Sequence, residues 1–137
     1  MADSRQSLRE RSLRLLAQRE HSRAELMRKL AGHAEVDEIS AEIERLAELG
    51  LQSDARFAEA WVRSKAARHG LSRLRRDLAQ RGIAQDLIDE TLQHADLDDE
   101  LARARAVWAS RYTAPPADHR EWARQARFLQ SRGFSSS

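Results

Sequence analysis

The side chains of this sequence that could do chemistry are mostly arginines. Of its 24 basic residues, 22 are Arg, and three of them, Arg73, Arg75 and Arg76, stand off the apolar side of a helix expected over residues 72–81. Guanidinium groups in such positions suit contacts with phosphates. Because only Gln80 could read a base there, we expect such contacts to be electrostatic and unspecific, with a solvated or protein-binding surface as the alternative.

Other basic residues extend this candidate surface along the chain. We expect contacts with nucleic acid or a protein partner from Arg63, Lys65, Arg68, Arg73, Arg75, Arg76, Arg81, Arg124, Arg127 and Arg132. Charge also alternates in blocks, with a net charge of +5 over residues 5–30, −5 over 35–48, +6 over 63–81, −7 over 86–100 and +5 over 103–132. Such a chain could bind a polyanion through its basic faces while its acidic faces meet neighbouring helices or a partner.

Catalytic and metal-binding patterns find no support in the sequence. Its histidines never occur four residues apart, and it has neither a Gly-rich phosphate loop nor a nucleophile elbow. The absence of cysteine excludes disulfides and thiolate metal sites. The acidic run at 98–100 lacks the turn glycine of a cation site and suits the start of a helix instead. We therefore expect a binding protein and not an enzyme, without cofactor or metal.

The three tryptophans could in principle stack on bases, as in proteins that hold single-stranded nucleic acid. Trp61 and Trp108 stand at similar places in two expected helices, each with apolar neighbours at helical distance. Trp122 lies on the apolar side of another helix. We therefore expect all three to anchor the core.

The elements that must position these side chains are all helices, because Ala, Leu, Arg and Glu dominate and no stretch alternates with period two. We expect helices that begin near residues 5, 22, 36, 53, 72, 83, 98 and 118. Expected caps are capping boxes at Ser22 and Asp118, single caps at Ser53 or Asp54 and at Ser72, and helix-closing turns at Gly32, Gly50, Gly70, Gly82 and Gly133. Expected buried lines include Val36, Ile39, Ile43 and Leu46, and further along Leu101, Ala104, Trp108 and Tyr112.

An internal echo divides the chain. Leu-x-x-Arg-Gly-Ile at 78–83 returns 51 positions later as Leu-x-x-Arg-Gly-Phe at 129–134. Together with the charge blocks it predicts three tandem, helix-turn-helix-like three-helix bundles over residues 1–50, 51–96 and 97–137, the last without its final helix. By analogy Gly133 should close a helix, Phe134 should lie between helices, and one of Ser135–Ser137 should cap a ninth. We therefore expect the natural protein to continue for roughly another helix, about 11 to 12 residues.

Several short motifs, in this order and spacing, cover almost the whole chain. They are Ser22-Arg-Ala-Glu25-Leu26 with Leu30, Leu46-Ala-Glu-Leu49-Gly50-Leu51 with Ser53-Asp54, Phe57-Ala58-Glu-Ala-Trp61-Val62, Gly70 and Leu78 with Arg81-Gly82-Ile83, and Phe128-Leu129-Gln-Ser-Arg132-Gly133-Phe134. Each is weak alone, but together they make the sequence resemble the RecX family, bacterial regulators of the RecA recombinase. In two respects the sequence departs from that family: Ser53-Asp54 stand where relatives often carry paired acids, and relatives continue past Arg-Gly-Phe through a ninth helix.

The resemblance implies an elongated, curved array that binds RecA in the helical groove of its filament on single-stranded DNA. It also implies inhibition of strand exchange, ATP hydrolysis and co-protease function, in homologous recombination and the SOS response, without a catalytic site or cofactor.

Two other interpretations stay open. The helix-turn-helix units could form a stand-alone regulator that binds duplex DNA, and the incomplete third repeat could mediate self-association. No apolar run is long enough to cross a membrane and the N-terminal residues lack the apolar region of a signal peptide, so we expect a cytoplasmic protein without a membrane partner.

Overall fold

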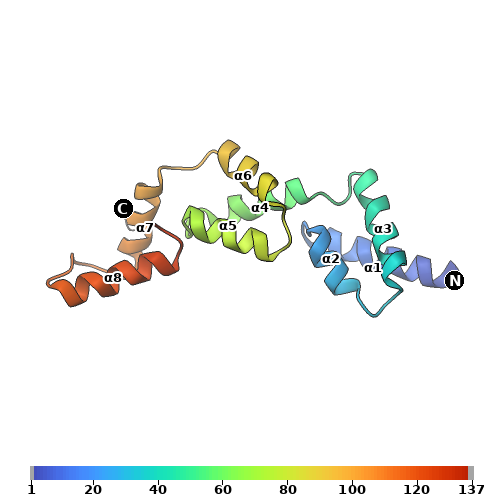
Figure 1. Cartoon of the computed structure of the whole chain (residues 1–137), viewed down its shortest axis with the longest axis horizontal. Coiled ribbons are helices and arrows are strands. Elements are labelled where there is room, and N and C mark those ends of the chain that lie inside the picture. The colour runs from blue at the N-terminus through green and yellow to red at the C-terminus, as the bar shows by residue number, and fades with distance from the viewer. Residues whose placement is uncertain (1, 136–137) are drawn as a thin grey trace.

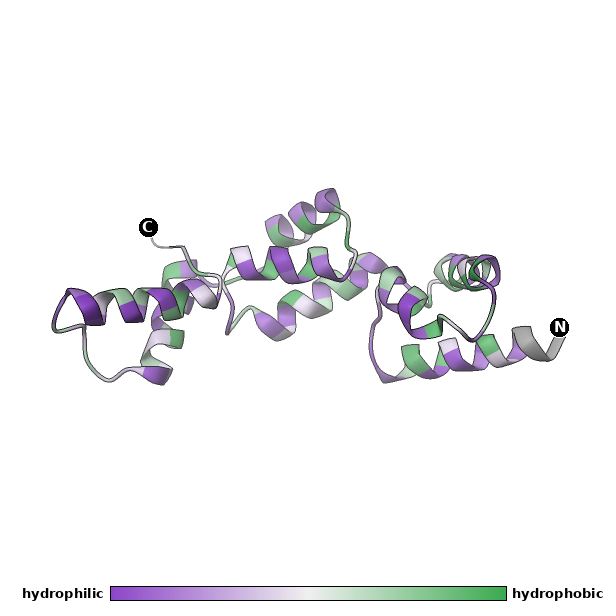
Figure 2. Cartoon of the chain, turned by 60° about the horizontal axis from the view of Figure 1, so that its bottom comes forward, coloured by the Kyte–Doolittle hydropathy of each residue, from purple (hydrophilic) through white to green (hydrophobic). Residues whose placement is uncertain are grey.

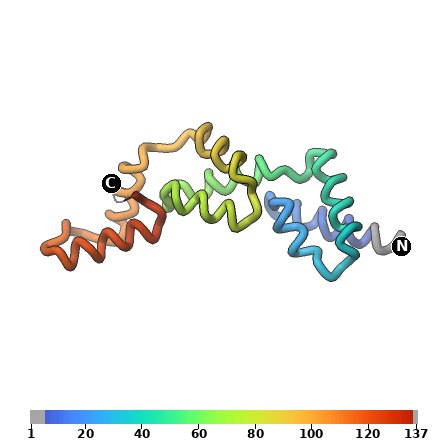
Figure 3. The backbone as a smooth tube through the Cα atoms, viewed as in Figure 1, coloured from blue at the N-terminus to red at the C-terminus, as the bar shows by residue number. Residues whose placement is uncertain are grey.

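The computed structural model describes residues 2–135 and contains, within that range, eight helices and no strand. The helices are α1 (Ala2–Gln18), α2 (Arg23–Leu30), α3 (Val36–Glu48), α4 (Asp54–Lys65), α5 (Leu71–Gln80), α6 (Gln85–His94), α7 (Glu100–Arg111) and α8 (His119–Ser131). They form three groups in a row, α1–α3, α4–α6 and α7–α8, which make an elongated molecule (Figures 1 and 3). The predicted all-helical array of repeats is therefore confirmed.

The first group buries a small core between its three helices. The core residues, all at most 3% exposed, are Leu8, Leu26, Leu30, Ile39 and Ile43. The predicted capping box is present, since the Glu25 amide donates to Ser22 Oγ and the Ser22 amide donates to the Glu25 carboxylate, each at 3.1 Å. Val36, which was expected to be buried, is 67% exposed. It is the first residue of α3, and the burial of this helix begins only at Ile39.

The second group has the largest core, built from Phe57, Ala58, Val62, Ala66, Leu74, Leu78, Ile83, Ile88 and Leu92. Trp61 packs against it, as predicted. Ser53 caps α4 by accepting a hydrogen bond from the Arg56 amide. The predictions that Gly70 closes α4 and that Ser72 caps α5 are wrong. Gly70 has φ −80° and is itself the residue that caps α5, so Ser72 lies inside that helix.

The third group, over the residues that the structure describes, consists of two helices that cross near their C-terminal halves. Trp108 Nε1 donates to Gln125 Oε1 at 2.8 Å, and Tyr112 meets Phe128 edge to face with ring centroids 5.5 Å apart. Phe134 is buried, as expected. Trp122 and Leu101 are each 57% exposed, so the predicted burial of these two residues is wrong. Trp122 lies in the first turn of α8, before the part that packs on α7, and Leu101 lies in the first turn of α7, where Glu100 and Arg103 make the contacts with the second group.

The remaining caps follow the expectations in part. Gly32, Gly50, Gly82 and Gly133 have φ values between 75° and 92°, the left-handed conformation that closes a helix. At α8 only half of the expected capping box forms: Asp118 accepts from the Glu121 amide, but the Glu121 carboxylate pairs with Arg124. The ninth-helix cap expected among Ser135–Ser137 falls largely outside the described residues. Each helix carries both hydrophobic and hydrophilic residues (Figure 2), as an array with small cores requires.

The sequence echo marks the joints between the groups. At the first joint, Ser22 Oγ at the start of α2 donates to the Arg81 carbonyl at 2.8 Å. A Cβ added to Gly82 would lie 2.3 Å from the Cβ of Ala24, so only glycine permits this approach. The Arg23 amide, the first of α2, donates to the Asp54 carboxylate at 2.8 Å. The second group thus contacts α2 through the first turn of α4 and through the turn after α5.

The second joint repeats this arrangement one group later. Ser72 Oγ near the start of α5 donates to the Gly133 carbonyl at 3.0 Å, and the Gly70 amide donates to the Arg132 carbonyl at 2.8 Å. The first amide of α5, at Leu71, donates to the Glu100 carboxylate at 3.0 Å. A Cβ on Gly70 would lie 2.3 Å from the Gly133 carbonyl oxygen. The glycine at position 70 therefore serves the close approach of two backbones and not a left-handed turn.

Candidate nucleic-acid and partner interface

The three arginines of α5 differ in whether an acidic side chain compensates their charge. Arg75 pairs with Asp89 on α6, and its hydrogen bond lowers the pKa of Asp89 below the ordinary value. Arg73 Nε lies 3.6 Å from the Asp77 carboxylate, and its Nη1 donates to the Ser131 carbonyl at the second joint. Arg76 is exposed, and no ion pair involves it within residues 2–135. Of the three, Arg76 is the one whose charge is uncompensated.

Two more candidate cations gather on Trp61. The Arg81 guanidinium lies 3.9 Å from the ring centroid, and Lys65 Nζ lies 5.1 Å from it. Arg81 also donates to the Asp77 carbonyl at 3.1 Å. Stacking on an aromatic face orients a guanidinium without neutralising its charge. Trp61 therefore acts both as a core anchor and as a platform for two basic residues.

The candidate arginines of α8 lie beside a second aromatic cluster. Arg132 lies 4.8 Å from the Phe128 ring centroid, and Arg111, at the end of α7, lies 5.5 Å from the same centroid. Arg127 is exposed without an ion-pair partner in the described chain, whereas Arg124 pairs with Glu121 at 2.7 Å. Arg111 was not among the candidates from the sequence, because it stands in another helix, 17 positions before Phe128.

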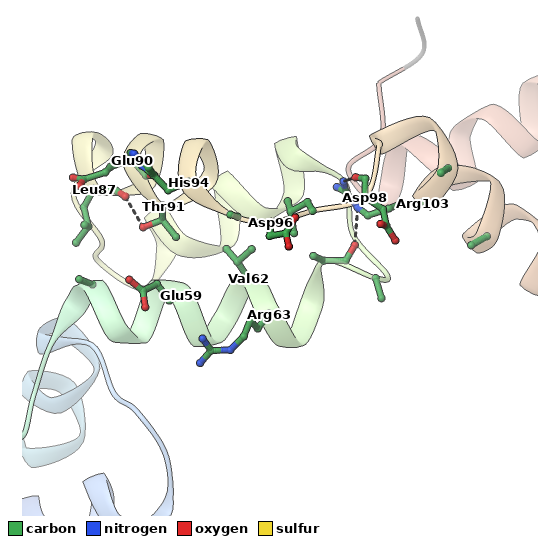
Figure 4. Close-up of a pocket in the computed structure, with 17 residues that line it drawn as sticks. Glu59, Val62, Arg63, Leu87, Glu90, Thr91, His94, Asp96, Asp98 and Arg103 are labelled. Carbon is green, nitrogen blue, oxygen red and sulfur yellow. Dashed lines mark hydrogen bonds between the residues drawn. The ribbon is translucent and has the colours of Figure 1, made fainter.

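Arg63 and Arg68, the remaining candidates, are both exposed and near the end of α4. Arg63 stands at the rim of a groove of about 840 Å³ between α4, α6 and the start of α7, which we call the junction groove (Figure 4). Arg68 lies in the turn between α4 and α5. The ten candidate residues are thus spread over α4, α5, α8 and the turns that follow them, and do not converge on one pocket.

Arg103 is a buried arginine that was not among the candidates from the sequence. Its side chain is directed to the end of α4 and donates to three backbone carbonyls, those of Ala66 at 2.9 Å, Asp98 at 2.8 Å and His69 at 3.3 Å. A cation suits the C-terminal end of a helix, where carbonyl groups lack partners. Arg103 therefore joins the third group to the second and is not available to a ligand.

Two histidines have pKa values set by their surroundings. Burial lowers the pKa of His21, which lies fully inside the first joint with Nδ1 3.0 Å from the Arg19 carbonyl. Burial also lowers the pKa of His69, and the Arg73 charge adds to this effect. Both rings are therefore neutral near pH 7. Residues 2–135 contain no group of three or more His, Cys, Asp or Glu side chains that could hold a metal, and none of their helices could span a membrane.

Known proteins resemble this chain in sequence and in fold. Two family models match, the RecX second three-helix domain over residues 53–92 and the RecX third three-helix domain over residues 98–137. A regulatory protein RecX from Leptothrix cholodnii is 49% identical over 131 residues, which is 95% of this chain and 83% of that protein. The RecX of Halorhodospira halophila is also 49% identical, over 96% of this chain and 83% of its own length.

Solved structures agree with these matches at the level of the fold. The crystal structure of RecX from Lactobacillus salivarius superposes with a TM-score of 0.75 at 23% identity and covers 99% of this chain and 92% of its own. Another crystal structure of a regulatory protein RecX gives a TM-score of 0.78 at 21% identity, over 98% of this chain and 70% of its own. With two family domains, close relatives and a shared arrangement of helices, the chain belongs to the RecX family of regulatory proteins.

Proposed function

We propose that this chain binds the RecA recombinase and its filament on single-stranded DNA and modulates RecA, most often as an inhibitor. The activities affected are strand exchange, ATP hydrolysis and co-protease function, in homologous recombination and the SOS response. The chain acts by binding in the cytoplasm, without catalysis or cofactor. Its membership of a family of regulatory proteins supports this proposal. Within it, we take the repeats to be residues 1–50, 51–96 and 97–137.

The observation that carries the proposal is the distribution of uncompensated charge along a rod. Arg63, Arg68, Arg76 and Arg127 are exposed and have no ion-pair partner in the described residues. They belong to the second and third groups, which also carry the cations held on Trp61 and Phe128. A filament offers a long phosphate backbone, and a rod with several separate cations can contact it at several points. Such binding weakens steeply as salt rises.

Co-sedimentation with RecA filaments on single-stranded DNA, scored beside the RecA ATPase rate, tests the proposal. We expect the chain to sediment with the filament and to slow ATP hydrolysis. Arg76→Glu combined with Arg127→Glu should weaken binding and reduce the slope of log affinity against log salt by about two, one for each phosphate that is no longer neutralised. Arg14→Glu combined with Arg28→Glu makes the same charge change on two exposed arginines of the first group that also lack an ion-pair partner in the described residues, and an equal loss there would show that the contact is not confined to the second and third groups.

Two outcomes would overturn the proposal. A chain that neither sediments with the filament nor changes its ATPase rate is not a RecA regulator. Tight, sequence-selective binding of duplex DNA by the chain alone would instead indicate a stand-alone DNA-binding regulator. Light scattering in the same buffer tests the self-association that exposed Trp122 and Leu101 would favour, and a monomer at all concentrations would exclude it.

A further inference from the structure

The junction groove lies between the second and third groups, and six of its 17 lining residues are alanines. Ala66 and Ala67 line it from the turn after α4, Ala102 and Ala106 line it from α7, and Leu87 and Leu97 add larger apolar surface. Alanines leave room for another backbone to approach closely, and a groove of about 840 Å³ can hold several side chains of a docked segment. The groove therefore has the room and the apolar surface to receive side chains of another chain.

The rim of the groove is acidic and uncompensated. Four carboxylates surround it, those of Glu59, Glu90, Asp96 and Asp98 (Figure 4), and none has an ion-pair partner among the described residues. The exposed cation at the rim is Arg63, while the Arg103 guanidinium is held by backbone carbonyls. This field repels a nucleic-acid backbone and attracts Lys and Arg side chains.

We propose that the junction groove binds a basic amphipathic helix of a protein partner, with its apolar side on the alanines and its Lys or Arg residues beside the four carboxylates. If the proposed function holds, that helix belongs to RecA, and the inference rests on the proposed function to this extent. The two kinds of surface then have different partners. The uncompensated arginines contact DNA, and the acidic groove contacts protein. A helix in the groove touches α4, α6 and α7 at once, and so it also braces the second joint.

A model peptide tests the groove without RecA. A fluorescein-labelled helix of Leu and Lys, with one apolar side, is titrated with the full chain and followed by anisotropy, beside a Leu and Glu counterpart. We expect only the basic peptide to bind. Glu59→Lys combined with Glu90→Lys should weaken it about tenfold or more, since two attractive pairs become repulsive. Glu38→Lys combined with Glu48→Lys makes the same charge change on exposed residues of α3 and should change affinity little.

A second pair of variants tests the shape of the groove and not its charge. Ala102→Gln combined with Ala106→Gln places long neutral side chains in the groove at two exposed positions and keeps good helix formers in α7. These variants should keep their helicity and no longer bind the peptide. Failure of the basic peptide to bind, or an equal weakening in the α3 control, would overturn the inference.

A crosslinking experiment tests the groove on RecA filaments, and it is possible because the chain contains no cysteine that would also be labelled. In Ala106→Cys the new thiol is labelled with a benzophenone, which then lies in the groove. Ala79→Cys, at an exposed position of α5, is labelled in the same way as a control. On irradiation with RecA filaments we expect the groove label to crosslink to RecA protein at a basic, apolar segment. A groove label that crosslinks only to DNA, or to nothing while the chain still sediments, would overturn the inference. A chain that does not sediment refutes the proposed function, whereas the peptide titration still decides about the groove.

Discussion

Replacing Gly82 with alanine should loosen the joint between the first and second groups. Gly82 has φ +83°, which costs an L-residue about 1–2 kcal/mol. The new Cβ would also lie 2.3 Å from the Ala24 Cβ, where carbon atoms normally stay about 3.5–4.0 Å apart. The joint must therefore open by more than about 1 Å. Such a movement breaks the hydrogen bond from Ser22 Oγ to the Arg81 carbonyl, which contributes about 1 kcal/mol.

Gly50→Ala is the matched control, because Gly50 has φ +75° and an added Cβ there meets nothing within 4 Å. We expect a decrease of about 1–2 kcal/mol for Gly50→Ala and about 2–4 kcal/mol for Gly82→Ala in the free energy of unfolding. Urea titration followed by far-UV circular dichroism measures both, and amide hydrogen exchange shows whether protection falls at the start of α2.

A compensating change at Ala24 tests the close packing of Gly82 on this residue. In Gly82→Ala combined with Ala24→Gly the clashing Cβ is gone, and the nearest other atom of residue 24 is Cα at 3.8 Å, an ordinary contact. The double variant should therefore be more stable than the sum of the two single effects predicts, by about 1–2 kcal/mol. If Gly82→Ala costs no more than Gly50→Ala, and Ala24→Gly restores nothing, the turn after α5 is not a close-packed joint.

The remaining predictions concern single residues. Arg103→Met should cost about 3 kcal/mol, because three carbonyls at the second joint lose a charged donor, and hydrogen exchange should report the destabilisation first in α7 and α8. The free energy of unfolding should fall as the pH drops below about 6.5, because His21 and His69 bind protons in the unfolded chain more readily than in the folded chain, where their pKa is lowered. His21→Gln should flatten this dependence. A wild-type free energy that stays constant between pH 7.5 and 5.5 would contradict the prediction. Trp122→Phe should remove most of the iodide-quenchable tryptophan fluorescence, since this ring is 57% exposed; unchanged quenching would show that Trp122 is buried after all.

The features that the sequence predicted best are those that depend on a few neighbouring residues. The capping box at Ser22 and the left-handed turn at Gly82 depend on hydrogen bonds and backbone angles inside four or five positions, so their residue types identify them. The apolar line of α3 likewise follows from its period, except at Val36, where the helix begins before its packing does. The same boundary effect exposes Trp122.

The candidate site was predicted less well, because charge alone does not tell whether an arginine is free. Arg75 and Arg76 are neighbours in sequence, yet Arg75 meets Asp89 from the next helix and Arg76 meets no acid in the described chain. The position of α6 beside one side of α5 decides this difference, and that position has no local signal in the sequence. Arg103 looked like one more basic residue of a block, whereas three carbonyls from two segments hold it.

The repeated Arg-Gly pair at 81–82 and 132–133 illustrates the difference between what the sequence predicts and what requires the tertiary structure. Sequence alone established the repeat, its helices and the membership of a family, because caps, periodicity and motif order are properties of the chain itself. The reason for the repeated motif is visible only in the tertiary structure. Each Arg-Gly turn packs on the start of a helix about 60 residues earlier in the chain, where Ser22 or Ser72 donates a hydrogen bond to a carbonyl of the turn. The tertiary structure also decided that Gly70 is a backbone contact and that four carboxylates share one groove, since both depend on distances between separate helices.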